Sequence, residues 1–264
     1  MNFGLIIVGD EILSGKRQDK HLAKVIELLG ARGLSLAWAR YVGDDRERMT
    51  ATLREAFATR DVVFSCGGIG ATPDDHTRQA AAAALGVPLV LHPEAKALIE
   101  QRMRDVAAEQ GTPYEPDRPD NVHRLNMGVF PEGAAIIPNP YNKIPGFSVG
   151  EVHFVPGFPV MAHPMIESLL DGRYAALHGS HRQVEQSVIV FGGMEATLTP
   201  LMEAVEQEHP GIKVFSLPSV DHPQYGRHIE LGVKGAAALV PAAYARLLSA
   251  LRAMQVTLGP EMVR

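Results

Sequence analysis

One segment, residues 66–77, combines residue types that attract phosphate with types that repel it. Glycines let a backbone approach a ligand closely and leave successive N–H groups free to bind an anion. Adjacent carboxylates repel phosphate, but a divalent cation reconciles the two, because Mg²⁺ is usually held by one or two carboxylates together with substrate phosphate. The segment therefore predicts a site for a phosphate-containing small molecule and a divalent metal such as Mg²⁺, Mn²⁺ or Co²⁺. Its members are the glycines Gly67, Gly68 and Gly70 and the carboxylates Asp74 and Asp75.

The end of the same segment also has a purely structural interpretation. Thr72 suits a helix N-cap, Pro73 suits the first helical position, and Asp75 falls where an acid completes a variant of the capping box. This interpretation needs no ligand, but it does not account for the three glycines together. The glycines favour a ligand site, and the capping alternative stays open.

A second acidic pair, Asp10 and Glu11, follows the first apolar run of the chain. A polar turn is the simplest interpretation of this pair alone. If residues 3–8 and 61–66 are parallel strands, however, their carboxyl ends meet at one edge of a sheet, where open α/β sheets bind ligands. Asp10 and Asp75 then face the same crevice, and Asp10 and Glu11 become candidate metal ligands beside Asp75.

Strand and helix patterns alternate along the first 170 residues. Near-continuous apolar runs are typical of parallel strands covered on both faces, and apolar side chains at helical spacing follow them. This order predicts an α/β fold with a mostly parallel sheet between helices. The expected strands are 3–8, 34–42 and 61–66, the expected helices are 20–32, 46–59, 73–85, 93–110 and 159–170, and a hairpin is expected over 147–156.

Loops after the later strands supply candidates for the far side of the crevice. Asn139, Lys143 and Gly146 lie on such loops and are candidate ligand contacts. Lys143 has the charge to balance a phosphate, although a lone lysine on a loop is equally well explained as a solvated side chain.

A polar stretch, residues 171–185, indicates a domain boundary, and it separates predicted domains over 1–172 and 186–256. The second domain has the order β-α-β-β-α, which describes a small α+β sandwich with its helices on one face. We expect the last ten residues to be frayed. Two histidines of the boundary, His178 and His181, are too few for a zinc site, which needs three or four ligands.

Composition narrows the class of protein. The chain has 264 residues, 46% of them hydrophobic, a net charge of −5 and one cysteine. The acidic balance argues against a nucleic-acid partner, and a single cysteine fits a reducing compartment. No run approaches the ~20 apolar residues that cross a bilayer, and the apolar N-terminus is expected to be a strand rather than a signal peptide. We expect a cytoplasmic protein without a membrane partner.

Taken together, several motifs resemble the MoaB/Mog family of molybdopterin-binding domains. Two proline-glycine segments narrow the resemblance to the branch found in the N-terminal part of the competence/damage-inducible protein CinA. The resemblance covers residues 1–170, and residues 187–256 look like the small middle domain of CinA, whereas no segment resembles its C-terminal amidase domain. The motifs are Gly9–Gly15, Asp19, Val42–Asp45, Gly67–Thr77, Pro145–Phe147 and Val155–Pro159.

The resemblance implies a three-layer α/β/α domain that binds its ligand over the glycine-rich turn, and a homo-oligomer. Asp75 occupies the position of the family's metal or catalytic aspartate, and Thr77 follows it as the motif requires. We therefore add Thr72 and Thr77 to the candidate ligand contacts and Asp74 and Asp75 to the candidate catalytic residues.

Three activities are compatible with the resemblance. The CinA branch implies metal-dependent hydrolysis of a nucleotide pyrophosphate such as ADP-ribose or FAD. The molybdopterin branch implies either binding of molybdopterin or a nucleotide without catalysis, or molybdopterin adenylyl transfer in cofactor biosynthesis. Two departures from the family pattern concern the site itself: Ala71 replaces the usual proline after the glycines, and Lys20-His21 replace the polar pair that usually follows Asp19.

Overall fold

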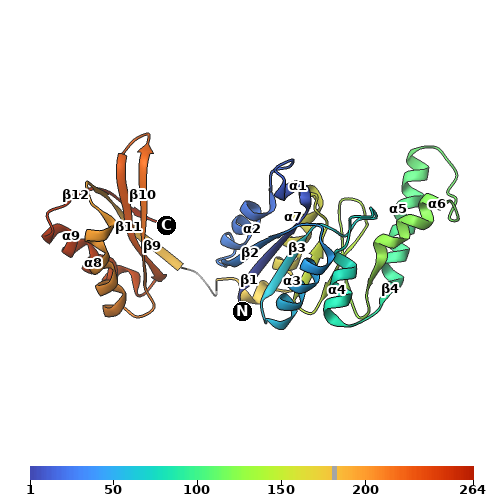
Figure 1. The fold of residues 1–264 in the computed structure, drawn as a ribbon, viewed down its shortest axis with the longest axis horizontal. Helices are drawn as coiled ribbons and strands as arrows, with labels where there is room; N and C mark the ends of the chain where they lie inside the picture. The colour runs from blue at the N-terminus through green and yellow to red at the C-terminus, as the bar shows by residue number, and fades with distance from the viewer. Residues whose placement is uncertain (180–182) are drawn as a thin grey trace. The chain divides into compact units, whose positions relative to one another are not determined.

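The computed structural model describes residues 1–179 and 183–264. The chain forms two compact units, Met1–His178 and Gly179–Arg264, which are described separately (Figure 1). The predicted boundary segment 171–185 includes residues 180–182, and with them His181, which lie outside the described residues.

A six-stranded, mostly parallel sheet is the centre of the first unit. Its order is β2-β1-β3-β8-β7-β6. The neighbours β2, β1, β3 and β8 run parallel, while β7 pairs antiparallel with both β8 and β6. The strands span Phe3–Val8 (β1), Leu36–Val42 (β2), Val62–Cys66 (β3), Ala135–Ile137 (β6), Gly146–Val149 (β7) and Val152–Val155 (β8).

Helices cover both faces of this sheet, because the central strands are apolar on both sides. Alternate residues of β1 enter two different cores: Phe3, Leu5 and Ile7 pack with α2 and α7, whereas Ile6 and Val8 pack with α3 and α4. The expected three-layer α/β/α architecture is confirmed (Figure 1). These helices span His21–Gly30 (α2), Arg46–Ala58 (α3), Thr77–Leu85 (α4) and Pro159–Asp171 (α7), and a short helix covers Asp10–Leu13 (α1).

A smaller subdomain follows α4 within the first unit. Its two strands, Leu89–Leu91 (β4) and Val129–Pro131 (β5), pair antiparallel, and the helix α5 (Pro93–Glu109) lies between them in the chain. The short helix α6 (Pro119–Arg124) and the 3-10 turn η1 (Leu125–Gly128) complete it. Sequence patterns predicted α5 but not α6.

The helix after the glycine-rich segment begins later than expected. The capping interpretation placed Thr72 at the N-cap, whereas α4 begins at Thr77, with His76 at its N-cap. The Thr72 amide and hydroxyl both donate to one carboxylate oxygen of Asp75, and the Asp75 amide donates back to the Thr72 carbonyl. These bonds close a separate turn ahead of the helix, so the capping interpretation is wrong.

The second unit is a four-stranded antiparallel sheet with the order β10-β11-β9-β12. The helices α8 and α9 pack on one face of it, as predicted. The prediction of a frayed C-terminus is wrong, because β12 pairs with β9 and the Arg264 guanidinium lies 2.9 Å from the Glu230 carboxylate. The elements are Gln183–Phe191 (β9), Glu195–Glu208 (α8), Lys213–His222 (β10), Gly226–Ala236 (β11), Val240–Ala253 (α9) and Thr257–Val263 (β12).

Within the described part of the chain, no helix is long and apolar enough to cross a membrane.

Candidate functional site

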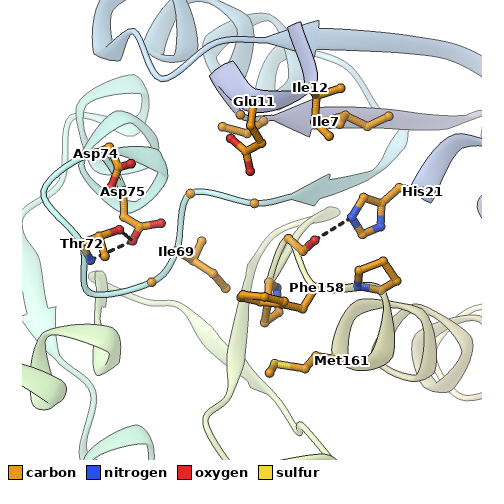
Figure 2. A pocket seen from close by; sticks show the side chains of 18 of the residues that line it. Ile7, Glu11, Ile12, His21, Ile69, Thr72, Asp74, Asp75, Phe158 and Met161 are labelled. Atoms are coloured by element: carbon orange, nitrogen blue, oxygen red, sulfur yellow. Dashed lines mark hydrogen bonds between the residues drawn. The ribbon is translucent and has the colours of Figure 1, made fainter. Parts of the chain in front are cut away.

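A cavity of about 740 Å³ opens at the carboxyl ends of β1, β3 and β8 (Figure 2). Loops after these strands and the segment 139–145 form its walls. This is the edge at which open α/β sheets bind ligands, and the volume lies within the usual range of ligand pockets. The topology therefore brings the glycine-rich segment and the first acidic region to one place, as the sequence predicted.

The glycine turn leaves no room for side chains. Gly67 has a φ of 109°, and a Cβ atom there would lie 2.5 Å from the Val8 carbonyl oxygen. A Cβ atom on Gly70 would lie 2.6 Å from the Asp75 carboxylate. Real Cβ atoms do not approach this closely, so only glycine permits the turn to pack against β1 and the following loop.

The turn presents unpaired backbone donors to the cavity. The Gly67 amide donates to the Val155 carbonyl at 3.0 Å and is therefore not available to a ligand. The amides of residues 68–71, in contrast, have no hydrogen-bond acceptor among the described residues, and all four residues line the cavity. Successive unpaired N–H groups form an anion-binding concavity.

Thr77 shapes the turn rather than the cavity wall. Its side chain is fully buried, its hydroxyl donates to the Gly67 carbonyl at 3.0 Å, and its amide donates to the Gly68 carbonyl. Thr77 therefore lies behind the glycines and does not line the cavity. Thr72 does line the cavity, together with Asp74 and Asp75.

Asp75 is held by Thr72. Its Oδ2 atom accepts hydrogen bonds from the Thr72 amide at 2.9 Å and the Thr72 hydroxyl at 2.5 Å. Its Oδ1 atom has no hydrogen-bond partner among the described residues. Interaction with Thr72 also lowers the pKa of the neighbouring carboxyl of Asp74. One oxygen of Asp75 is thus fixed and the other is free for a proton or a cation.

Arg78 supports the turn from behind. Its guanidinium is buried and donates to the carbonyls of Gly70 and Asn126. Burial lowers the pKa of Arg78, and the charge of Asp75 opposes that effect. The buried positive charge of Arg78 is therefore bonded to the backbone of the same segment, residues 68–71, whose amides are unpaired. No motif of the sequence marks Arg78 as part of the site.

Three acidic side chains from α1 and from the loop after β2 lie together at the cavity, and they are called the acidic lip below. Asp10 and Asp44 exchange hydrogen bonds, each carboxylate accepting from the other's amide at 3.1 and 2.9 Å. Burial is the main cause that raises the pKa of Asp44, and the charges of Asp10, Glu11 and Asp74 raise it further. Glu11 and Asp44 line the cavity, whereas Asp10 does not. Among the described residues, none of these three carboxylates forms an ion pair with a lysine, arginine or histidine.

These acids fit a divalent cation only if a ligand completes its coordination. No group of three or more His, Cys, Asp or Glu side chains in the described residues is arranged to hold a metal by itself. The donors are carboxylate oxygens, which suit Mg²⁺, and Mg²⁺ typically takes only one or two protein carboxylates and fills its other positions with water and phosphate. Glu11, Asp44, Asp74 and Asp75 are the cavity-lining candidates.

The cations of the cavity differ from the predicted one. Lys143 does not line the cavity, because its ammonium lies 2.6 Å from Asp105 on α5. Arg17 and Lys20, from the loop between α1 and α2, do line it, and neither forms an ion pair within the described residues. The sequence analysis did not identify them as ligand contacts, although the unusual Lys20-His21 pair marked this loop.

The other predicted contacts on these loops, Asn139 and Gly146, also differ in whether they line the cavity. Asn139 lines the cavity, is 5% exposed, and uses its carboxamide to shape the loop that follows. Gly146 does not line it; this glycine lies in β7, where a side chain would collide with the Phe154 carbonyl of β8. His178, which was not predicted to contact a ligand, lies away from the cavity, and its Nε2 atom is 2.9 Å from the Leu170 carbonyl oxygen.

His21 joins two walls of the cavity. The side chain is 5% exposed, and its Nε2 atom lies 3.1 Å from the Gly157 carbonyl, so the start of α2 is tied to the loop between β8 and α7 (Figure 2). Burial lowers the pKa of His21. The ring is therefore neutral at pH 7 and donates from Nε2 to the carbonyl.

Comparison with known proteins assigns the family. A match to the family of probable molybdopterin binding domains spans residues 4–176. A CinA-like protein of Syntrophotalea carbinolica is 31% identical over 217 residues, which are 78% of this chain and 50% of that protein. A protein of Pyrobaculum calidifontis is 33% identical over 236 residues, 85% of each chain. The chain thus spans about half the length of the CinA-like relative and most of the archaeal one.

A solved structure agrees with this assignment. The crystal structure of the protein CinA, of unknown function, from Thermoplasma acidophilum matches with a TM-score of 0.54 and 27% identity, and it covers 65% of this chain and 98% of its own. The sequence and fold together fit the MoaB/Mog-like domain of CinA-like proteins. The chain therefore belongs to the family of probable molybdopterin binding domains.

Proposed function

We propose that the first unit is a metal-dependent pyrophosphatase that hydrolyses the diphosphate bond of a nucleotide such as ADP-ribose or FAD. One observation carries the proposal: unpaired backbone donors and unpaired cations meet an unbalanced group of acids within a single cavity. A diphosphate bridged to the acids by a cation satisfies all three groups, whereas an uncharged ligand balances neither the cations nor the acids.

The reaction adds water across the P–O–P bridge. A water oxygen forms a bond to one phosphorus, the bridging P–O bond breaks, and two phosphomonoesters leave. A bound Mg²⁺-type ion would supply Lewis acidity to the phosphoryl group and a lower pKa for the water. Glu11, Asp44, Asp74 and Asp75 are the residues that would hold it.

The chain's own groups have distinct roles in this scheme. The amides of residues 68–71 bind the phosphate oxygens and stabilise the charge that develops on them. The free Oδ1 atom of Asp75 accepts a proton or ligates the cation, and Thr72 fixes its orientation. Arg17 and Lys20 bind the outer phosphate oxygens, and the buried Arg78 favours anion binding from below.

The test is hydrolysis by the purified full chain. ADP-ribose or FAD is incubated with Mg²⁺, Mn²⁺ or Co²⁺, and the two phosphomonoesters are quantified. We expect turnover that requires the metal and falls at least about a hundredfold in Asp75→Asn, which retains the oxygen that Thr72 needs. Glu195→Gln, a helix-start acid of the second unit, is the matched control and should have full activity. Equal activity of Asp75→Asn and the unmutated chain would refute the assignment.

A binding protein without catalysis is the second candidate. Two observations favour it: the Asp75 carboxylate is engaged by Thr72, and the described residues hold no ready-made metal group. Calorimetry with molybdopterin or a nucleotide separates the two. Tight binding without metal that survives Asp75→Asn supports the binding protein, and consumption of ATP with molybdopterin would indicate adenylyl transfer instead.

A further inference from the structure

The subdomain between β4 and β5 contacts the glycine turn through residues that do not line the cavity. The Nε2 atom of His123, in α6, lies 2.8 Å from the Ala71 carbonyl oxygen. The backbone carbonyl of Asn126, in η1, accepts from the Arg78 guanidinium, which also donates to the Gly70 carbonyl. Two consecutive carbonyls of the turn, those of residues 70 and 71, are therefore held by donors outside the cavity.

The side chain of Asn126 determines which nitrogen of His123 carries the proton. Its carboxamide Nδ2 atom lies 3.4 Å from the Nδ1 atom of His123. A carboxamide nitrogen can only donate, so Nδ1 is the acceptor and the proton of the neutral ring is on Nε2. His123 therefore donates from Nε2 to the Ala71 carbonyl. The ring is exposed to solvent, so this bond, rather than burial in a core, is its main contribution.

The two short elements that carry these side chains are firmly attached to the rest of the subdomain. Asn121 of α6 is 5% exposed, and its carboxamide both donates and accepts hydrogen bonds within the subdomain. At the end of η1, the Gly128 carbonyl accepts from the His92 amide at 2.9 Å, just before α5. The backbone that presents the imidazole to the turn is therefore fixed.

The planarity of the peptide unit transmits the bond from His123 to the next amide of the chain. In a trans peptide unit the C=O and N–H groups point in opposite directions. When the Ala71 carbonyl is held on one side, the Thr72 amide is directed to the other, where it donates to the Oδ2 atom of Asp75 at 2.9 Å (Figure 2). The orientation of Asp75 thus depends on where His123 holds the carbonyl.

We propose that His123 is a positioning residue for Asp75. Its Nε2–H group holds the Ala71 carbonyl, the Thr72 amide is thereby directed at Oδ2, and the Oδ1 atom of Asp75 stays free. The part that Oδ1 takes in hydrolysis rests on the proposed function, whereas the orientation of the turn does not. The site then includes a residue 52 positions further along the chain than the carbonyl that it holds.

The first test is amide hydrogen exchange in the full chain, followed by NMR. We expect the Thr72 amide to be protected and His123→Ala to speed its exchange about tenfold. His123→Gln keeps a donor on a side chain of similar reach and should keep most of the protection. The Gly67 amide, which donates to the Val155 carbonyl, should be unchanged in both variants. Val122→Ala is the matched control, because Val122 is 52% exposed on the same helix and has no polar side-chain atom.

Three outcomes of the exchange experiment would overturn the role of His123. Unchanged exchange at Thr72 in His123→Ala would show that the bond does not hold the turn. Equal acceleration in His123→Ala and His123→Gln would show that donation is not what matters. Faster exchange at Gly67 as well would indicate a general loosening of the segment.

The second test is hydrolysis of ADP-ribose in the presence of Mg²⁺. His123→Ala should lower kcat about tenfold and leave KM within about twofold, because the amides that bind phosphate remain, and His123→Gln should restore most of the rate. In an Asp75→Asn background, His123→Ala should have no further effect, because His123 acts through Asp75. A further tenfold loss in that background would overturn the proposal.

The two tests separate the positioning role from the pyrophosphatase proposal. Loss of Thr72 protection in His123→Ala, together with absent hydrolysis by the unmutated chain, would leave the positioning of Asp75 standing and refute the enzyme. Hydrolysis that depends on Asp75 but is unchanged in His123→Ala would leave the enzyme standing and refute the positioning role.

Discussion

Both units contain a buried strand that ends in glycines and leads to a helix. In the first unit β3 is followed by residues 67–76 and α4, and in the second β9 is followed by residues 192–194 and α8. The local sequences look alike, because each begins with Gly-Gly. Their surroundings are different, and only the first lines the cavity described above.

The difference lies in the surroundings of the two turns, because the amides of residues 192–194 also have no hydrogen-bond acceptor among the described residues. The turn of the first unit exposes the unpaired amides of residues 68–71 where parallel strands end. In the second unit Gly193 packs against Val190 and Leu198 of its own core, and the carboxylate of Glu195 accepts from the Ser216 hydroxyl of β10. Glycines before a helix therefore indicate a ligand site only when the free amides of the turn also line a cavity.

Substitution of the glycines gives the sharpest contrast between the two turns. Gly67→Ala adds strain at a φ of 109° and a collision with the Val8 carbonyl, so it should lower the free energy of unfolding of the first unit by on the order of 4 kcal/mol. Gly192→Ala has a φ of 68° but open space around the new methyl group, so its cost should be about 1 kcal/mol. Urea denaturation followed by circular dichroism measures both. Similar costs at the two positions would contradict the contrast.

Acid should act more strongly on the first unit than on the second. His153 is fully buried between Ser148 and Tyr174, and burial, aided by Arg173, lowers its pKa to about 4. Between pH 6.5 and 4 the unfolded chain binds a proton that the folded state does not. His153 therefore leaves the free energy of unfolding unchanged above pH 6.5 and lowers it by about 3 kcal/mol towards pH 4.

Thermal unfolding from pH 7 to pH 4 checks this expectation. His153→Gln removes the titrating group, so the variant should lose correspondingly less stability over that range. If its profile follows that of the unmutated chain, other groups cause the acid sensitivity.

Arg78 gives a third contrast between the two turns, because the described residues of the second unit include no buried arginine. Arg78→Met should weaken the binding of inorganic pyrophosphate about tenfold, since the buried charge and the bond to Gly70 are lost. Arg78→Lys keeps the charge and should bind with intermediate affinity. Calorimetry at two salt concentrations measures both, and unchanged affinity in the methionine variant would remove Arg78 from the anion site.

The smallest expected effect concerns the acidic lip. Because burial and neighbouring acids raise the pKa of Asp44, its charged form destabilises the folded state, and stability without ligand should rise as pH falls through that pKa. Asp44→Asn keeps the acceptor for the Asp10 amide and removes the repulsion, so the Tm of the ligand-free protein should rise by roughly 1 to 2 °C. Metal-dependent hydrolysis should fall in the same variant. A lower Tm would show that the lip is not strained by charge.

Much of the fold and part of the site follow from local sequence patterns. Apolar runs predicted β1, β2 and β3, and helical spacing predicted α2, α3, α5 and α7, because these signals are contained within single elements. The glycines and the pair Asp74–Asp75 were predicted to lie at the cavity for a different reason. The direction of parallel strands determines the edge of the sheet at which their carboxyl ends meet.

What the sequence did not predict depends on contacts between distant segments. Thr72 satisfies the capping pattern, and only its bonds to Asp75 show that it belongs to a separate turn. Lys143 is directed to Asp105, which is 38 positions away in the chain. The pairing of β12 with β9 has no local signature either, because Gly259 and Pro260 interrupt its strand pattern.

The hydrogen bond between His21 and the Gly157 carbonyl has a consequence for ligand size. It spans from the helix that follows Arg17 and Lys20 to the loop that carries Phe158, so the cations and the aromatic ring are held at one separation. Under the proposed function, this fixed separation sets the distance that a bound nucleotide diphosphate has to span.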